Sequence, residues 1–571
     1  MRPPNRRREP GSDELAWLVG GGLLIGVFVL FAAAWAAARW ASPAAAGDPF
    51  TYGAGYLSGR STWPPGATGR FLVLLLPLLI LAGFLGLLLV RSGRGRSRID
   101  GRASSMAAAR DLRELEEPAM RKDAARLDTQ SKNCGSPLGA SVRLGRPLFG
   151  SLEWVQLWIM GPRAGKTSCV CVRQILETDG PVLTTSNKRD SVDLTRGPRS
   201  EIGAVWVNDL QALIGEEPTW WWNPLSYVTD VSRADQLAAL FAAASRDTGT
   251  KGDAYFDGAG KNLLSSLLLA AAVADTPITQ VYTWLTDPEN LDPVTHLRGA
   301  GHDLPAEALE SAIRLTPKQR DGVFGTALEM ASFLRNAQVL PWVTPAGIPD
   351  SRPQFDPAAF VRSRQTLYLI SREGRGSARA LTAALTVAVV EAAEDFAATQ
   401  ARGRLAIPLT CVLDEAANVC RWPELPDLYS HYGSRGIVMS TFLQSWSQGV
   451  QVWGREGMDK LWSAANVRGV GPGVGEPEFL DRISRLVGDH DVLTRDQSRS
   501  RSGRSVSMRN RRERILDTAD LAALPRGRAV VFVSGLPAVL LKLVHWSAAP
   551  YAQNVRASEQ HYGSIASKKA S

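Results

Sequence analysis

The hydrophobic pattern of the chain begins with two long uncharged stretches. Leu15 to Ala38 is an apolar run of 24 residues, which as a helix would be about 36 Å long at roughly 1.5 Å per residue. Phe71 to Val90 is a second run, of 20 residues, and its Pro77 is tolerable in a transmembrane helix. Both runs are long enough to cross a hydrocarbon layer of about 30 Å. The pattern predicts a two-helix transmembrane anchor within residues 1–102, and two buried core helices are the alternative.

The positions of the arginines predict the orientation of this anchor. They cluster outside the two runs and are sparser in the loop between them: Arg2, Arg6, Arg7 and Arg8 come before, Arg91, Arg94, Arg96, Arg98 and Arg102 come after, and Arg39, Arg60 and Arg70 lie between. Positive charge is retained on the cytoplasmic side of a membrane. We therefore expect a multi-pass protein of the cytoplasmic membrane, with both termini in the cytoplasm.

After residue 102 short apolar runs alternate with helical patterns, which predicts an α/β fold with a parallel sheet. The runs that suit buried strands are Trp154–Met160, Pro181–Thr185, Ala204–Val207, Gln365–Ile370, Leu409–Leu413 and Gly436–Leu443, followed by a hairpin at Arg528–Val544. Residues 232–345 are mostly helical in pattern. We expect a nucleotide-binding domain at 103–231 and 346–552, an inserted all-helical domain at 232–345, and a polar, disordered tail at 553–571.

Composition narrows the class of protein. A hydrophobic content of 45% and a charged content of 21% suit a packed globular body rather than a disordered one. The five cysteines form no CxxC pair and have no histidine at ligand spacing. A zinc site or a disulfide framework is therefore not expected, and a reducing compartment fits the main body.

The segment after the Trp154–Met160 run predicts a phosphate-binding loop. Gly161-Pro162-Arg163-Ala164-Gly165-Lys166-Thr167-Ser168 stands between a strand and a helix that extends to Glu177. In such a loop the backbone N–H groups and the helix dipole face a phosphate, Lys166 reaches the β- and γ-phosphates, and the Thr167 hydroxyl holds Mg²⁺. Three residues, rather than the usual four, separate Gly161 from the Gly-Lys pair. Either the loop is one residue short, or Met160 takes the position of the first glycine, and we favour the second explanation. The alternative to a phosphate-binding loop is a Gly-Lys-Thr sequence that occurs by chance at the start of a helix.

Strand ends later in the chain provide groups for hydrolysis. The run Leu409–Leu413 ends in Asp414 and Glu415. Asp414 is suited to hold Mg²⁺ together with Thr167, and Glu415 is suited to act as general base toward water. Gln444, at the end of the Gly436–Leu443 run, could sense the γ-phosphate or orient that water. Arg435 is a candidate arginine finger for a neighbouring subunit, and a structural salt bridge is the alternative.

An arginine-rich segment, Arg495–Arg514, predicts contact with nucleic acid. Its eight arginines face only two acidic residues, a local net charge of +6, and its serines and glycine do not suit a hydrophobic core. The predicted contact residues are Arg499, Arg501, Arg504, Arg509, Arg511 and Arg512. A solvated charged loop and a contact with lipid headgroups are the alternatives.

Several motifs in order resemble the TraG/TraD-type coupling proteins of conjugal type IV secretion systems. Besides the phosphate loop they are SNKRD at 186–190, WNPL at 222–225, DAYFDGAGKNLL at 253–264, LYLIS at 367–371, LDEAANV at 413–419, SRG at 434–436, LQS at 443–445, and Asn466. The resemblance covers most of the chain from about Ala103 to Ala552, plus the anchor.

The resemblance implies a RecA-like P-loop motor with an all-helical insertion behind a membrane anchor. Its cofactors would be ATP and Mg²⁺, and its assembly a homo-hexamer. Its partners would be single-stranded DNA or a relaxase–DNA complex, the components of a type IV secretion channel, and the inner membrane. A double-stranded DNA translocase of the FtsK type and a non-catalytic membrane adaptor with a vestigial nucleotide site are the competing hypotheses.

Overall fold

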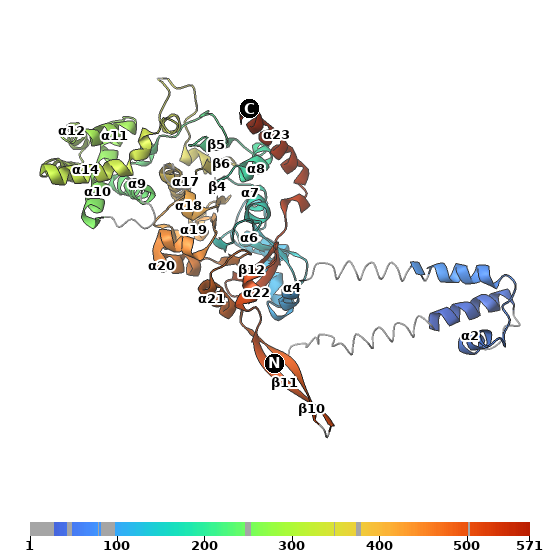
Figure 1. The fold of residues 1–571 in the computed structure, drawn as a ribbon. Coiled ribbons are helices and arrows are strands. Elements are labelled where there is room, and N and C mark those ends of the chain that lie inside the picture. The colour runs from blue at the N-terminus through green and yellow to red at the C-terminus, as the bar shows by residue number, and fades with distance from the viewer. Residues whose placement is uncertain are drawn as a thin grey trace. The chain divides into compact units, whose positions relative to one another are not determined.

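The computed structural model describes residues 28–42, 48–77, 79–80, 97–245, 253–347, 349–372, 379–500 and 503–570, without the side chains of 494–500, 503–507, 509 and 564–570. The chain forms two compact units, Met1–Arg96 and Ser97–Ser571 (Figure 1).

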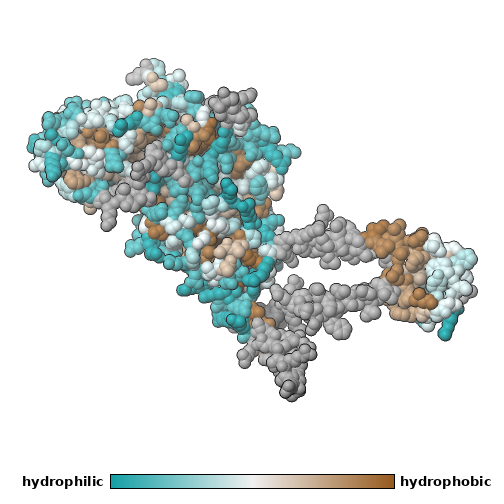
Figure 2. Space-filling model, viewed as in Figure 1, coloured by the Kyte–Doolittle hydropathy of each residue, from teal (hydrophilic) through white to brown (hydrophobic). Residues whose placement is uncertain are grey.

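The first unit contains helical segments at 28–41 and 67–77 and the helix α2 (Pro49–Leu57). Asp48 caps α2 by accepting hydrogen bonds from the N–H groups of Phe50 and Thr51. Apolar side chains such as Leu72 and Leu76 are exposed along the 67–77 helix (Figure 2).

Among the described residues, no helix has the length and the apolar character needed to span a membrane. The predicted spans lie largely outside those residues, since 15–27, 78 and 81–90 are not described. The two-span anchor therefore stays a prediction.

The second unit is built on a mixed sheet, in which the described part has eleven strands in the order β2-β1-β13-β12-β9-β3-β8-β7-β4-β6-β5. From β9 to β5 all neighbours are parallel, whereas β12, β13, β1 and β2 continue the sheet antiparallel. The strands are β1 (Ser136–Ser141), β2 (Pro147–Gly150), β3 (Gln156–Ile159), β4 (Val182–Ser186), β5 (Val205–Asp209), β6 (Thr366–Ile370), β7 (Leu409–Leu413), β8 (Ile437–Leu443), β9 (Val467–Val470), β12 (Arg528–Val533) and β13 (Val539–Lys542). The predicted parallel sheet and the hairpin near residue 530 are confirmed.

The central strands are covered on both faces, which explains their continuous apolar sequences. Every residue of β4, β6, β7 and β8 is buried. The helices outside residues 232–345 are α4 (Arg98–Arg102), α5 (Ala109–Leu112), α6 (Glu117–Arg126), α7 (Val172–Leu176), α8 (Asp190–Ser200), α16 (Pro357–Phe360), α17 (Arg379–Thr399), α18 (Ala416–Val419), α19 (Leu425–Arg435), α20 (Trp446–Ala464), α21 (Pro477–Val487), α22 (Thr518–Ala522) and α23 (Ala552–Ala570). All five cysteines are free and buried.

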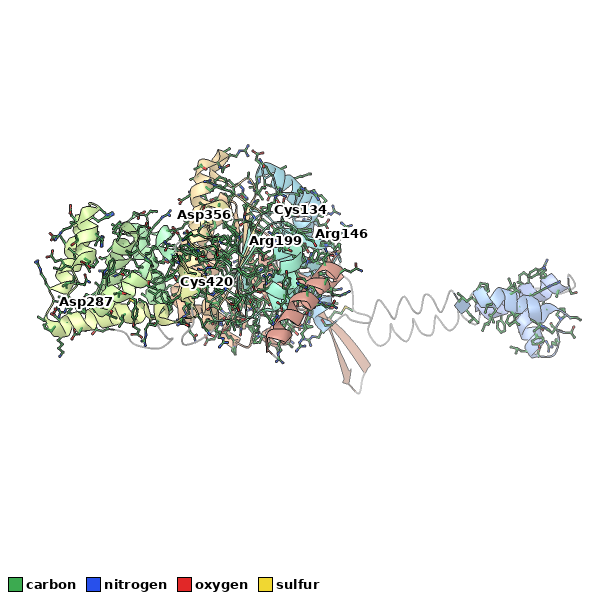
Figure 3. All side chains as sticks on the ribbon, turned by 90° about the horizontal axis from the view of Figure 1, so that it is seen from above. Cys134, Arg146, Arg199, Asp287, Asp356 and Cys420 are labelled. Atoms are coloured by element: carbon green, nitrogen blue, oxygen red, sulfur yellow. The ribbon has the colours of Figure 1, made fainter. Side chains whose placement is uncertain are left out.

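Arg199 at the end of α8 is wholly buried and ties the starts of several strands together. Its guanidinium donates to Thr366 Oγ1 at 2.7 Å and to the carbonyls of Thr178 and Gly180 at 2.9 Å each. In Figure 3 it lies within the packed body, whereas Asp287 lies at the outer end of the helical region. These bonds satisfy a charged group that would otherwise be costly to bury.

A helical region follows β5 and precedes β6. Its helices are α9 (Val231–Ser245), α10 (Ala254–Val273), α11 (Thr279–Thr286), α12 (Asp292–Gly299), α13 (Asp303–Ile313), α14 (Pro317–Met330) and α15 (Leu340–Val343). Apolar residues of α9 and α10, such as Leu237 and Leu264, belong to the same hydrophobic core as Leu183 of β4 and Leu367 of β6. The helices thus share a core with the sheet, and their separation as a domain at 232–345 stays a prediction.

The arginine-rich segment forms a regular antiparallel hairpin of β10 (Asp489–Ser500) and β11 (Gly503–Arg514). Its register runs from the pair Asp489–Arg514 to the pair Ser500–Gly503. The hairpin extends away from the main sheet (Figure 1). A segment with no apolar core of its own is therefore held by its backbone ladder.

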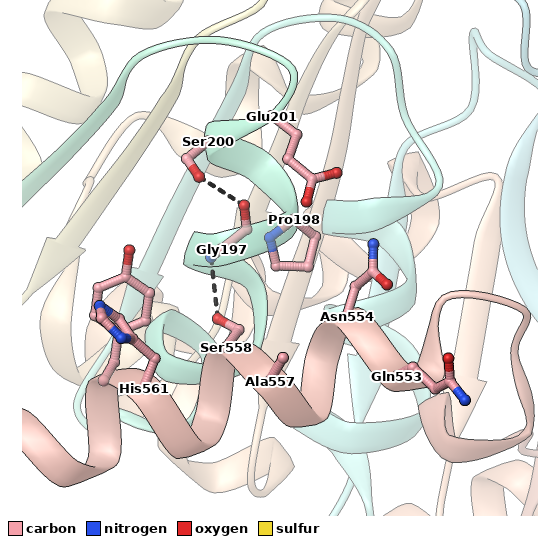
Figure 4. Close-up of a pocket in the computed structure, with 10 residues that line it drawn as sticks. Gly197, Pro198, Ser200, Glu201, Gln553, Asn554, Ala557, Ser558 and His561 are labelled. Atoms are coloured by element: carbon pink, nitrogen blue, oxygen red, sulfur yellow. Dashed lines mark hydrogen bonds between the residues drawn. The ribbon is translucent and has the colours of Figure 1, made fainter.

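The expectation of a disordered tail at 553–571 is wrong for the part that the structure describes, because this part forms the helix α23. Ala552 and Val555 of α23 pack in one apolar cluster with Leu194 of α8. Ser558 Oγ donates to the Asp193 carbonyl at 2.5 Å and accepts from the Gly197 N–H at 3.0 Å, beside a surface hollow of about 500 Å³ between the two helices (Figure 4). The tail is mostly polar in composition, so the few apolar residues that pack on α8 did not predict a helix.

Candidate nucleotide site

The phosphate loop begins where β3 leaves the sheet. The Met160 N–H still donates to the Leu443 carbonyl of β8 at 3.0 Å, and the Met160 side chain is fully buried. The Gly161 N–H donates to the Pro472 carbonyl at 3.0 Å. The Gly161 N–H is therefore already hydrogen-bonded within the protein and is not free to donate to a phosphate.

The middle of the loop has the backbone shape that a concave anion site requires. Arg163 and Gly165 both have left-handed φ angles, of 57° and 87°. Alternating left- and right-handed residues turn successive N–H groups toward one side. Arg163 is exposed and Ala164 is buried, while the Ser168 hydroxyl lies 3.9 Å from Cys169 Sγ. After the loop the chain passes through a π-helical turn, Thr167–Cys171, into α7.

Lys166 is held by both carboxylates that the sequence placed at the end of β7. Its Nζ lies 2.8 Å from Asp414 Oδ1 and donates a hydrogen bond to Glu415 Oε1. All three side chains are more than nine-tenths buried. Burial by itself would lower the pKa of Lys166, but the charges of the two carboxylates outweigh it and raise that pKa above the ordinary lysine value. Lys166 therefore stays an ammonium ion at neutral pH.

Thr167 and Asp414 form an oxygen pair suited to magnesium. The Thr167 hydroxyl donates to Asp414 Oδ2 at 3.2 Å, and the Thr185 hydroxyl of β4 donates to the Asp414 carbonyl at 2.9 Å. No group of three or more His, Cys, Asp or Glu side chains in the described ranges could hold a metal ion. Mg²⁺ commonly takes one or two protein oxygens and completes its shell with phosphates and water. The donor set therefore fits a metal that arrives with a nucleotide.

The Glu415 side chain reaches the same site as that of Asp414 because the backbone at Glu415 is left-handed. Glu415 has a left-handed backbone, with φ 57° and ψ 39°, between β7 and α18. This conformation costs a non-glycine residue roughly 1–2 kcal/mol, and it brings two consecutive carboxylates onto one lysine. Gln444 Nε2 donates to Glu415 Oε2 at 2.9 Å. Gln444 follows β8, the strand that lies between β3 and β7 in the sheet.

The other predicted site residues lie elsewhere or outside the described side chains. Arg435 ends α19 just before β8 begins. It therefore lies at the amino ends of the parallel strands, whereas the phosphate loop follows the carboxyl end of β3. Arg501 is not described, and neither are the side chains of Arg499, Arg504 and Arg509. Arg511 and Arg512 are exposed near the base of the hairpin, where Arg512 Nε lies 3.3 Å from Asp489 Oδ2.

Sequence reasoning missed residues that support the predicted ones. Thr185 was assigned to a strand without a role, and its hydroxyl contacts Asp414. Gln448 Oε1 accepts the Gln444 N–H at 2.9 Å. The only signal for Thr185 was its position at the carboxyl end of a strand predicted to be parallel. Gln448 carried no signal, because its contact depends on how α20 begins.

A family model matches residues 408–526 and is described as the TraM recognition site of TraD and TraG. Over these residues the chain is similar to TraD and TraG. The match includes the Asp414–Glu415 pair, Gln444 and the arginine-rich hairpin, whereas the phosphate loop lies outside it. Among curated proteins none matches the chain.

Solved structures share the fold of this chain. One is "Bacterial conjugative coupling protein TrwBdeltaN70" in its unbound monoclinic form, with TM-score 0.53 and 18% identity over 74% of this chain and 91% of that one. A second is the plasmid coupling protein TrwB in complex with a non-hydrolysable ATP analogue, with TM-score 0.53 and 16% identity over 74% and 92%. A third is TrwB with ADP and Mg²⁺, with TM-score 0.51 and 17% identity over 74% and 92%.

Proposed function

We propose that this chain is a membrane-anchored P-loop ATPase that recruits a relaxase–DNA substrate and passes it to a type IV secretion channel in conjugal transfer. The observation that carries the proposal is the convergence of Lys166, Asp414 and Glu415 in one buried cluster, with Thr167 and Gln444 hydrogen-bonded to it. The TraG/TraD match and the nucleotide complexes of TrwB support it.

Each residue of the cluster has a role that its contacts suit. Lys166 leaves the carboxylates to bind the nucleotide phosphates, which Gly161 to Ser168 surround. Thr167 and Asp414 would hold Mg²⁺, which would supply positive charge against the phosphates. Glu415 accepts a proton from the attacking water as general base, and Gln444 orients that water.

The remaining roles need more than one subunit or partner. Arg435 lies at the sheet edge opposite its own phosphate loop, so it would serve as an arginine finger only for a neighbouring subunit, as in a homo-hexamer. The two predicted spans would anchor the chain in the cytoplasmic membrane with both termini inside. The helical region would face the DNA–relaxase cargo, and the hairpin β10–β11 would contact single-stranded DNA.

The proposal is tested by Lys166→Ala in the full-length chain. We expect it to abolish ATP hydrolysis and DNA transfer while membrane extraction behaves as in the wild type, because Lys166 lies outside the predicted anchor. Lys122→Ala, at an exposed lysine of α6, is the matched control.

Three results would contradict the proposal. Wild-type turnover in Lys166→Ala would overturn the assignment of the site, and normal transfer without any hydrolysis would indicate a non-catalytic adaptor. Stimulation of hydrolysis by double-stranded but not single-stranded DNA would favour a translocase of the FtsK type.

A further inference from the structure

The turn between β9 and α21 contacts two parts of the nucleotide site at once. This segment, Gly471 to Glu476, is called the bridging turn below. Its sequence, GPGVGE, carries three glycines and one carboxylate. One end lies on the phosphate loop, and the other end lies on the helix that follows Gln444.

The first contact is between two backbones. The Gly471 N–H donates to the Ile159 carbonyl at 2.9 Å, and the Pro472 carbonyl accepts from the Gly161 N–H at 3.0 Å. A Cβ atom on Gly161 would lie 2.2 Å from the Gly473 carbonyl oxygen. The start of the phosphate loop and the bridging turn are therefore packed backbone to backbone, which explains glycine at both positions.

The second contact is made by the Glu476 carboxylate. Glu476 Oε2 accepts the Trp446 N–H at 2.7 Å, and Oε1 accepts the Ser447 N–H at 2.8 Å. These are the first two N–H groups of α20, which have no partners within the helix. A carboxylate there also interacts favourably with the helix dipole. The Phe479 ring of α21 stacks on Trp446, with centroids 5.1 Å apart.

Gln444 lies between these two fixed points. It is followed by Ser445, the N-cap of α20, and preceded by Leu443, whose carbonyl accepts the Met160 N–H at 3.0 Å. The first turn of α20 therefore determines where the Gln444 side chain stands relative to Glu415. The Glu476 carboxylate accepts hydrogen bonds from that turn. In the described contacts it touches none of Lys166, Asp414 and Glu415.

We propose that Glu476 is a positioning residue for hydrolysis: through the first turn of α20 it sets Gln444 against Glu415, while its own turn braces the phosphate loop. This inference rests on the proposed ATPase function. Glu476 does not contact the groups assigned to phosphate or magnesium. Its loss should therefore lower kcat much more than nucleotide affinity.

The test compares Glu476→Ala, Glu476→Gln and the control Glu478→Ala in the full-length chain. Glu478 is an exposed carboxylate in the first turn of α21, two residues after Glu476. We expect kcat for ATP to fall roughly 10- to 100-fold in Glu476→Ala, because small displacements of positioning groups have effects of that order. Glu476→Gln should recover part of the rate, since its amide oxygen accepts one of the two N–H groups. Glu478→Ala should behave as wild type.

A second measurement does not depend on turnover. Hydrogen exchange of the amides at 446 and 447 should be about tenfold faster in Glu476→Ala than in wild type, because each loses its acceptor. Unchanged exchange there would overturn the inference even if no variant hydrolysed ATP. Altered exchange with unchanged kcat would also overturn it and leave the ATPase intact. Absence of turnover in the wild type would instead count against the proposed function.

Discussion

Asp414 and Glu415 are consecutive residues that the structure directs to the same lysine. Lys166 is the counter-ion of both carboxylates. Burial of a lone carboxylate would be costly, and the pairing with Lys166 offsets that cost. A phosphate that binds Lys166 therefore competes with Glu415 for the same ammonium group.

This competition predicts two separate effects of Glu415→Gln. Hydrolysis should fall on the order of 10²- to 10⁴-fold, because the general base is lost. Affinity for a non-hydrolysable ATP analogue should be retained or become tighter, because an amide competes less strongly than a carboxylate for Lys166. Turnover at saturating ATP and an equilibrium titration with the analogue measure the two effects. Weaker binding with normal turnover at saturation would make Glu415 a structural residue.

Among the elements, the hairpin β10–β11 is the one whose sequence best suits nucleic acid. Its strands pair along their whole length, yet only Arg511 and Arg512 among its predicted contact residues have described side chains, and both are exposed. Asp489 lies at the base of the hairpin and pairs with Arg512 and Arg514. Because Asp489 pairs with arginines at the base, the remaining positive charge of the sequence belongs mainly to the residues between 495 and 509.

Replacement of the eight hairpin arginines by glutamine should weaken DNA binding in a salt-dependent way. If four of them engage single-strand phosphates, the log–log salt slope of binding should flatten by about 2.8, from roughly 0.7 per contact. Basal ATP hydrolysis should not change, and its stimulation by DNA should fall. Arg110→Gln, at an exposed arginine of α5, is the control. An unchanged slope with reduced liposome association would assign the hairpin to the membrane instead.

In the whole molecule, the helical region and the sheet cannot be treated as independent parts. Trp222 donates its backbone N–H to the Trp342 carbonyl at 2.9 Å, and buried residues of α9, α10 and α17 belong to one core. Deletion of 232–345 would therefore open the core as well as remove a surface. A surface substitution is the cleaner test of the cargo-facing role.

Leu304→Asp on α13 provides that test, because Leu304 is 83% exposed. We expect unchanged thermal unfolding and ATP hydrolysis, since the side chain contributes little to the core, but reduced transfer and reduced capture of a relaxase–DNA complex. Glu307→Ala, exposed on the same helix, should transfer normally. Normal transfer by Leu304→Asp would remove this face from the cargo surface.

Local patterns in the sequence were enough to find the phosphate loop, the strand-end carboxylates, most helices of 232–345 and the parallel strands. Periodicity and motif spacing report what a segment does over a few residues, and Lys166, Asp414 and Gln444 are recognisable at that range. The resemblance to the TraG/TraD family likewise rested on short motifs and agrees with the family match.

The tertiary structure decided what depends on distant partners. It placed β8 between β3 and β7, set Gly161 against Gly473, and put Glu476 on the first turn of α20. It also gave the polar tail a helix packed on α8. Each of these features depends on burial and hydrogen bonding between segments far apart in the chain, which no local pattern of hydrophobic and polar residues encodes.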